Sequence, residues 1–324
     1  LAPSDAEILA VLFTQVGGVP LADLNYVWCE AWVRAMKVEQ HLAPGTIRKK
    51  VQALAKVIDW HMRQVPGALA GNPLRMLPRG YSVYSAADAK LLAAKDLEVR
   101  HDVIRDRRFR PGEEGRIMAI LAGGRHPERE RGLSDPAELR MLFLIILGTG
   151  ARLREAYTVL RGDVDLRART LRVRQSKLRQ GRVAYRTIPL RPQLHAELAA
   201  WLQSTDGPDT APLLPALWDG DRSDEALKRT TRCLSSRFSA LFDQAQVEDM
   251  VEHDLRHEAT CRWLGERGPD GQWLFREQEV FKIMGWSPAS PMANRYASFR
   301  GEDLAARLWA TQSGSAGGAT SPAA

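Results

Sequence analysis

Hydrophobic residues recur at helical spacing along much of the chain, and this pattern predicts a mainly helical fold. The clearest case is APGTIRKKVQALAKVIDWHMRQ, residues 43–64, where apolar residues share one face of a helix. The residues of this stripe are Ile47, Val51, Leu54 and Ile58. Farther along, SAADAKLLAAKDLEVRHDVIR predicts another helix, because Ser85 and Asp88 have the spacing of a capping box.

The most apolar helix is predicted in DPAELRMLFLIILG, residues 135–148. Asp135 is suited to the N-cap and Pro136 to the first helical position, while Glu138 completes a capping box. Gly148 is expected to end the helix. Because its centre is apolar on every side, this helix is expected to be buried.

One region has the two-residue period of β-strands. In TLRVRQSKLRQGRVAYRTIPL, residues 170–190, Leu171 and Val173 alternate with arginines, which predicts a half-buried strand. The segment KLRQG is expected to form a turn, and RVAYRTI to return as a second strand. Beyond Pro192 the pattern is helical again to about residue 311. The predicted fold class is therefore mostly α, with a small antiparallel β-hairpin or sheet.

Changes in composition indicate where the chain divides into domains. RDRRFRPGEEG is charged and contains a Pro-Gly pair, so residues 107–112 are expected to be an interdomain linker. A helical domain of residues 1–106 precedes it, and a second domain of residues 113–311 follows. The tail, residues 312–324, is of low complexity and is expected to be disordered. A length of 324 residues agrees with two domains of roughly 150 residues each.

The charge of the chain narrows the choice of partner. A net charge of +7 and a pI near 9.5 suit a partner that carries phosphates, nucleic acid first and an anionic membrane second. The three cysteines, Cys29, Cys233 and Cys261, form neither a disulfide framework nor a zinc motif, which favours a reducing cytoplasm. The longest apolar run, MLFLIILG, is shorter than the ~18 residues of a membrane span. We therefore expect a cytoplasmic protein that does not span a membrane and whose first candidate partner is nucleic acid.

Candidate chemistry starts from HDLRH, residues 253–257. His253 and Arg256 are three positions apart and share one face of a helix. An imidazole beside a guanidinium suits a phosphate better than a metal ion. Further motifs lie on either side of this pair. TGARLREA contains Arg152 and Glu155, the strand turn contains Lys177, MGWSPAS contains Trp286, and NRYAS contains Tyr296.

With these motifs in this order, the sequence resembles the tyrosine recombinases, the phage integrase family. That family has a TG-x-R-x-x-E helix start, a Lys on a β-hairpin turn, an H-x-x-R helix, a G-[HW] step and a Tyr. Here they read TGARLRE, SKLRQG, HDLRH, GW and RY. The resemblance covers residues 113–311 in detail and 20–106 more loosely. It implies a helical, SAM-like core-binding domain followed by a tyrosine recombinase catalytic domain.

The resemblance implies a site-specific DNA recombinase that cleaves and rejoins strands without a metal, ATP or another cofactor. Tyr296 is the implied nucleophile, which forms a 3′-phosphotyrosyl link and releases a 5′-hydroxyl. Arg152 and Arg256 are the implied clamps on the non-bridging oxygens of the phosphate. His253 is expected to take and return the Tyr296 proton, and Lys177 to protonate the leaving 5′-oxygen.

Two further residues are expected to support these groups. Glu155 lies one turn after Arg152, where its carboxylate can orient Arg152 or His253 without itself contacting the phosphate. Trp286 stands where the family more often has His. Its indole N–H can donate to a phosphate oxygen but cannot carry a proton between groups, and packing alone is the alternative role.

Other basic residues are expected to contact the DNA backbone, which gives an affinity that falls steeply with salt. The candidates are Arg48, Lys49, Lys50, Arg172, Arg174, Arg179, Lys228, Arg229 and Arg232. Arg179 and Arg182 share the predicted turn with Lys177, so the sequence leaves open which of the three is the general acid.

The resemblance implies that the partner is double-stranded DNA with a specific inverted-repeat site, that the protein is nucleoid-associated, and that it has no membrane partner. GEDLAARLWATQ, residues 301–312, predicts an amphipathic helix. The resemblance implies that this helix docks on a neighbouring protomer within a tetramer on DNA, and docking on its own domain is the alternative. Type IB topoisomerase activity, telomere-resolvase activity and an inactive DNA-binding regulator on the same fold are the alternative functions.

Overall fold

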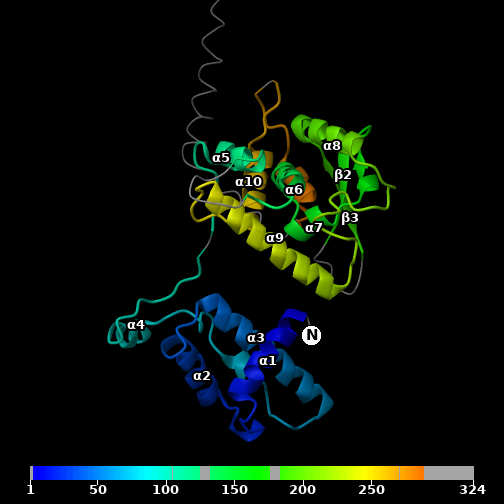
Figure 1. Ribbon diagram of the computed structural model, residues 1–324. Coiled ribbons are helices and arrows are strands. Elements are labelled where there is room, and N and C mark those ends of the chain that lie inside the picture. The colour runs from blue at the N-terminus through cyan, green and yellow to red at the C-terminus, as the bar shows by residue number, and fades with distance from the viewer. Residues whose placement is uncertain (1–2, 104, 125–131, 176–182, 270, 288–324) are drawn as a thin grey trace, which may run out of the picture. The chain divides into compact units, whose positions relative to one another are not determined.

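The structure is a computed structural model that describes residues 3–103, 105–124, 132–175, 183–269 and 271–287 (Figure 1). The chain divides into two compact units, Leu1–Ile104 (unit 1) and Arg105–Ala324 (unit 2). Most of the described residues are helical, as the hydrophobic pattern predicts, and no helix among them is long and apolar enough to cross a membrane.

Unit 1 is built from helices around a small apolar core. Its α-helices are α1 (Pro3–Val16), α2 (Tyr26–Val38), α3 (Pro44–Gln64) and α4 (Ala86–Ala93), with 3-10 turns at Leu21–Asp23 and Pro73–Met76. The predicted stripe of α3 faces this core, where Ile47, Val51 and Ile58 pack with Trp32 and Met36 of α2. Helix α1 packs on α3 (Figure 1).

Helix α4 begins where its capping box predicts but ends earlier than the pattern predicts. The Ser85 Oγ accepts from the Asp88 N–H at 3.2 Å, and the Asp88 carboxylate accepts from the Ser85 N–H at 2.9 Å. The helix ends at Ala93, and a residue farther along the predicted helix contacts α3 instead of continuing α4. Asp102 accepts from the Gly45 N–H at 2.7 Å and binds the Arg48 guanidinium, so it caps the start of α3.

Unit 2 is arranged around one buried helix. Its α-helices are α5 (Glu113–Leu121), α6 (Pro136–Thr149), α7 (Leu153–Tyr157), α8 (Pro192–Ser204), α9 (Asp224–Gln244), α10 (Glu252–Gly265) and α11 (Glu277–Met284). Helix α6 contacts α5, α7, α8 and α10 (Figure 1). Its apolar centre, including Leu142, Phe143 and Ile145, is fully buried, as predicted.

The predicted cap at the start of α6 is wrong, although Pro136 does occupy the first turn. Asp135 has a left-handed backbone with φ of 44° and makes no side-chain cap. The Glu138 carboxylate accepts instead from the N–H groups of Ala216 and Leu217, each at 3.1 Å. A tertiary contact thus replaces the local capping box.

The end of α6 is also two residues later than predicted. Gly148 lies inside the helix, where an added Cβ would come within 2.8 Å of a Leu194 methyl group, so its small size allows α8 to pack closely. Gly150, with φ of 69°, is the residue that ends the helix.

A three-stranded antiparallel sheet lies in the order β1-β2-β3. The strands are β1 (Val164–Asp165), β2 (Thr170–Arg174) and β3 (Tyr185–Pro189), and the 3-10 turn Arg161–Asp163 precedes them. Leu171, Val173 and Ile188 are fully buried, which confirms the predicted half-buried strands. The predicted turn between β2 and β3 lies outside the described residues at 176–182.

The structure places the segment predicted as a linker, residues 107–112, inside unit 2. Arginines of this region bind acidic residues of α10: Arg105 contacts Asp254 at 2.8 Å and Arg108 contacts Glu258 at 3.2 Å. The division between the units therefore falls at residues 104 and 105. The predicted helix at 301–312 and the tail at 312–324 lie outside the described residues.

Candidate active site

Arg152 stands at the N-cap of the short helix α7, held by the glutamate one turn later. Its Nη1 donates to the Glu155 Oε1 at 2.7 Å, and its backbone N–H donates to the Glu155 Oε2 at 3.1 Å. The Glu155 side chain is fully buried, whereas that of Arg152 is 23% exposed. The glutamate therefore anchors a guanidinium that still reaches the surface.

A second arginine, which the motifs did not identify, binds the same carboxylate. Arg186 lies on β3, is only 6% exposed, and donates through Nη2 to the Glu155 Oε2 at 2.8 Å. Its Nε donates to the Ile283 carbonyl at 2.9 Å. The strand pattern does contain a signal, because Arg186 pairs with the inward-facing Val173, and a charge at such a position requires a buried partner.

Burial alone would raise the pKa of Glu155, but the charges of Arg186 and Arg152 outweigh it and lower this pKa to about 2. The carboxylate is therefore ionised at neutral pH, as its ion pairs with Arg186 and Arg152 require.

Arg256 is almost completely buried on α10, with 2% of its surface exposed. Its Nη1 donates to the Gly150 carbonyl, two residues before Arg152, and its Nη2 donates to the Met284 carbonyl at 2.8 Å. Arg256 thus joins the residues just before Arg152 to the last turn of α11.

The end of α11 is where these contacts meet. The adjacent carbonyls of Ile283 and Met284 accept from Arg186 and Arg256, and the left-handed Gly285 then ends the helix with φ of 67°. These carbonyls lack helical donors, so the two guanidiniums satisfy groups that the helix leaves open. Strand β3 and helices α7, α10 and α11 are held together in one cluster.

His253 and Trp286 lie at positions next to this cluster. His253 is exposed on the first turn of α10, one turn before Arg256. Trp286 is partly buried, packs on Phe281 with ring centroids 5.8 Å apart, and has the Arg256 Cζ 6.0 Å from its ring centroid. The structure thus brings Arg152, Glu155, Arg256 and Trp286 into one region, with His253 on the adjoining turn.

Lys177, Arg179 and Tyr296 lie outside the described residues. Two other tyrosines of unit 2 are described. Tyr157 is fully buried and its hydroxyl donates to the Leu227 carbonyl at 3.0 Å. Tyr185 is half exposed and lies under the Arg172 guanidinium, 5.0 Å from its ring centroid. Burial and these contacts argue against Tyr157 as a nucleophile and leave Tyr185 as a control residue.

Comparison with known proteins identifies the family. The sequence model described as "Phage integrase family" matches residues 108–301. The chain belongs to the phage integrase family. It is accordingly a site-specific recombinase of the tyrosine type, an enzyme that breaks and rejoins DNA strands. No curated protein sequence matches this integrase significantly.

Solved structures share the fold of this integrase. The Tn1549 transposon integrase in complex with transposon right end DNA is 17% identical, with a TM-score of 0.62, over 95% of this chain and 92% of that chain. The XerH site-specific recombinase bound to difH substrate, in a pre-cleavage complex, is 16% identical, with a TM-score of 0.54 over 93% and 77% of the two chains. At these identities the likeness concerns the fold alone.

The predicted DNA contacts differ in how available they are. Lys49, Lys228, Arg229 and Arg232 are exposed. Three others hold internal contacts: Arg48 binds Asp102, Lys50 binds Gln15 at 3.2 Å, and Arg172 binds Asp163 at 2.7 Å. Arg174 is partly buried. Arg172 is exposed as well, so it remains a candidate for backbone contacts within this integrase's unit 2, together with the exposed residues of α9.

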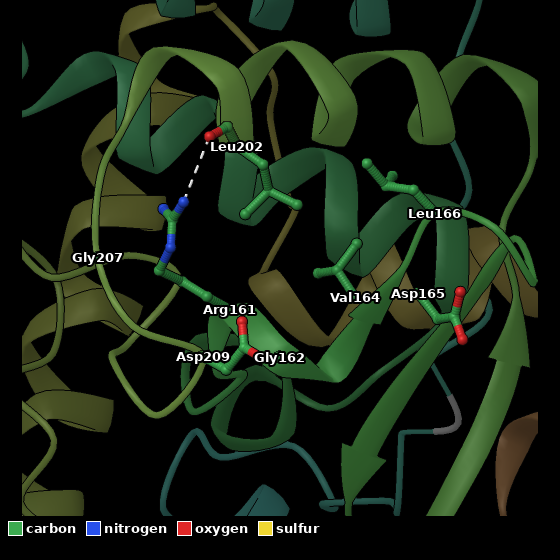
Figure 2. A pocket seen from close by; sticks show the side chains of 8 residues that line it. All are labelled: Arg161, Gly162, Val164, Asp165, Leu166, Leu202, Gly207 and Asp209. Atoms are coloured by element: carbon green, nitrogen blue, oxygen red, sulfur yellow. Dashed lines mark hydrogen bonds between the residues drawn. The ribbon is translucent and has the colours of Figure 1, made fainter.

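A pocket of about 410 Å³ lies in another part of unit 2 (Figure 2). It is lined by Arg161, Gly162, Val164, Asp165, Leu166, Leu202, Gly207 and Asp209. The Arg161 guanidinium binds the Thr205 hydroxyl at 2.7 Å and the Leu202 carbonyl at 3.3 Å, so it ties a loop to α8. None of the predicted catalytic residues lines this pocket. Among the described residues, no three His, Cys, Asp or Glu side chains are gathered as metal ligands.

The depressed pKa of Glu155 predicts a specific pH dependence of stability. Because its pKa falls from an ordinary 4.5 to about 2 on folding, ionised Glu155 stabilises the fold above pH 4.5, and this contribution is lost as the pH falls towards 2. We expect the free energies of unfolding of the wild type and Glu155→Gln to differ most at neutral pH and to converge towards pH 2. Denaturant unfolding at several pH values measures the difference. A gap that stays constant over this range would contradict the assignment.

Proposed function

We propose that Tyr296 attacks the scissile phosphate while Arg152 and Arg256 neutralise it, as in a conservative recombination reaction. The observation that supports this most is the bond from Arg256 to the Gly150 carbonyl, two residues before Arg152. It draws together the two elements that carry the candidate clamps. His253 on the turn before Arg256 adds an imidazole, a side chain suited to general acid–base catalysis.

In the proposed step, a bond forms between the Tyr296 Oη and phosphorus as the bond to the 5′-oxygen breaks. The phenol proton passes to His253, and the leaving oxygen takes a proton from Lys177 or a basic neighbour on the same turn. The guanidiniums bind the non-bridging oxygens, where charge accumulates in the transition state. A second 5′-hydroxyl then reverses the step, so the energy of the diester is conserved and ATP is not consumed.

The proposed substrate is double-stranded DNA with an inverted-repeat site, acted on in the cytoplasm at the nucleoid. Unit 1, residues 1–104, would serve as the core-binding domain and unit 2 as the catalytic domain. The Tn1549 integrase and XerH structures of the same fold are complexes with transposon DNA and with difH substrate. We further propose a tetramer on DNA in which residues 301–312 dock on a neighbouring protomer.

The test uses nicked duplexes that cover the ends of the DNA element flanking the gene. A nick close to the cleavage point lets the short product diffuse away, so a covalent protein–DNA adduct should accumulate, and strands of two intact sites should be exchanged. Plasmid DNA without the site serves as the control. Rapid relaxation of that plasmid would point to a topoisomerase, hairpin products to a telomere resolvase, and binding without any adduct to an inactive regulator.

A further inference from the structure

Arg186 is a buried arginine of the cluster to which the proposed chemistry gives no role. Its guanidinium contacts two different elements at once, Glu155 of α7 at 2.8 Å and the Ile283 carbonyl of α11 at 2.9 Å. Its remaining nitrogen, Nη1, is buried and has no hydrogen-bond partner among the described residues. A buried charge is costly unless it is paired, and Arg186 is paired with the same carboxylate that holds Arg152.

We propose that Arg186 is a positioning residue for DNA cleavage. Through Glu155 it fixes the Arg152 guanidinium, and through the Ile283 carbonyl it fixes the end of α11, from which the chain continues to Trp286. This inference rests on the proposed function, because it assumes that Arg152 binds the scissile phosphate.

The link to Arg152 passes through a single carboxylate. Glu155 uses Oε1 for the Arg152 side chain at 2.7 Å, whereas its Oε2 binds both the Arg152 N–H and Arg186. Arg186 thus restrains the oxygen that the Arg152 side chain does not use. Without it, the carboxylate could rotate and carry the Arg152 guanidinium with it.

The link to α11 depends on close approach of the backbone. An added Cβ on Gly285 would lie 3.2 Å from both the Cδ and the Nη1 of Arg186, and the φ of this glycine is 67°. Gly285 is therefore required both for the left-handed turn and for contact with the guanidinium. The residue that follows is Trp286, so a shift of Arg186 would move the backbone from which the Trp286 side chain extends.

Lysine cannot replace arginine in this role. The two contacts use Nη2 and Nε, two separate nitrogens of one planar group that reach two different acceptors. An ammonium group is a compact point charge and can satisfy the glutamate or the carbonyl, but not both in this geometry. Arg186→Lys therefore tests whether a positive charge at this position is sufficient or whether the planar guanidinium is required.

The chain contains a closely matched control arginine. Arg107 is nearly as enclosed, with 9% of its side chain exposed; it binds the buried Glu113 at 2.6 Å and, nearer the surface, the Glu248 carbonyl at 3.0 Å. Its described partners do not include Arg152 or α11. Arg107→Met and Arg186→Met thus remove the same kind of buried contact, one outside and one inside the proposed site.

The experiment measures single-turnover adduct formation on the nicked duplex, with protein in excess over its Kd and below the Tm of every variant. We expect Arg186→Met and Arg186→Lys to bind DNA within about threefold of the wild type, but to form the adduct about 10- to 100-fold more slowly. Arg107→Met should keep the wild-type rate although its Tm also falls. In a cycle with Glu155→Gln, the double variant should lose less than the product of the single losses.

A second pair of variants keeps the test valid should Arg186→Met fail to fold. In Gly285→Ala the added methyl group crowds Arg186. In Gly271→Ala the methyl group is added at a similar positive φ of 75°, but no other side chain or backbone atom lies within 4 Å of it. Only Gly285→Ala should slow adduct formation at a similar loss of Tm. Equal rates within either pair, or full activity of Arg186→Lys, would overturn the positioning role. Absence of any adduct with wild-type protein would instead reject the proposed function.

Discussion

Tyr296→Phe is expected to bind its DNA site with unchanged affinity and to form no covalent adduct. Removing the hydroxyl removes the atom proposed to bond phosphorus, while the ring and the proposed cationic groups are unchanged. Electrophoresis of denatured reactions with a labelled nicked duplex measures the adduct, and a mobility shift under native conditions measures binding.

Tyr185→Phe is the matched control, because Tyr185 is half exposed on β3 in the same unit. Its adduct should form at the wild-type rate. Tyr157 offers no such comparison, since its buried hydroxyl also contacts the Thr231 hydroxyl at 3.1 Å and its loss would disturb the core. An adduct that persists in Tyr296→Phe and vanishes in Tyr185→Phe would reassign the nucleophile.

Arg256→Ala is expected to lower the rate of adduct formation by at least about 10²–10³-fold, the usual cost of removing a fixed donor to a developing negative charge. It should also destabilise unit 2, because the Gly150 and Met284 carbonyls lose their donor, at about 1–3 kcal/mol for each buried group left unsatisfied. Single-turnover cleavage and thermal unfolding measure the two effects separately.

Arg256→Lys and Arg140→Ala separate the two effects of the Arg256 change. Lysine keeps the positive charge but cannot donate to two acceptors at once as the planar guanidinium does, so most of the rate of adduct formation should still be lost. Arg140 binds Glu197 at 2.8 Å in a partly exposed pair between α6 and α8, and its loss should cost roughly 1 kcal/mol or less with no change in rate. A variant without Arg256 that cleaves at the wild-type rate would remove this residue from the phosphate site.

Most of the fold could be predicted from the sequence because its signals are local and periodic. The alternation at Leu171 and Val173 predicts the sheet, and the apolar run at 141–148 predicts the central helix. The errors occur where distant residues replace a local partner. The Glu138 carboxylate accepts from backbone N–H groups of the loop at residues 216 and 217 rather than from the start of its own helix. Asp102 holds the chain after α4 against α3.

The candidate site could be predicted only as far as its motifs extend. His253 and Arg256 share a helix face because of their spacing, and Arg152 matches the TG-x-R start of the family motif, whereas Arg186 belongs to neither pattern. Its inward position in β3 was readable from the strand period, but its partners Glu155 and Ile283 come from segments 31 residues before it and 97 residues after it in the chain. Only the folded arrangement shows that one carboxylate serves two guanidiniums.

The most direct test of the account is to identify the amino acid that becomes linked to DNA. The wild-type adduct on a nicked duplex would be digested with nuclease and trypsin, and the peptide carrying the residual nucleotide sequenced by mass spectrometry. Cleavage after Arg295 and Arg300 releases the peptide YASFR, and the account predicts the nucleotide on its tyrosine, Tyr296. A nucleotide on any other residue of the chain would contradict it.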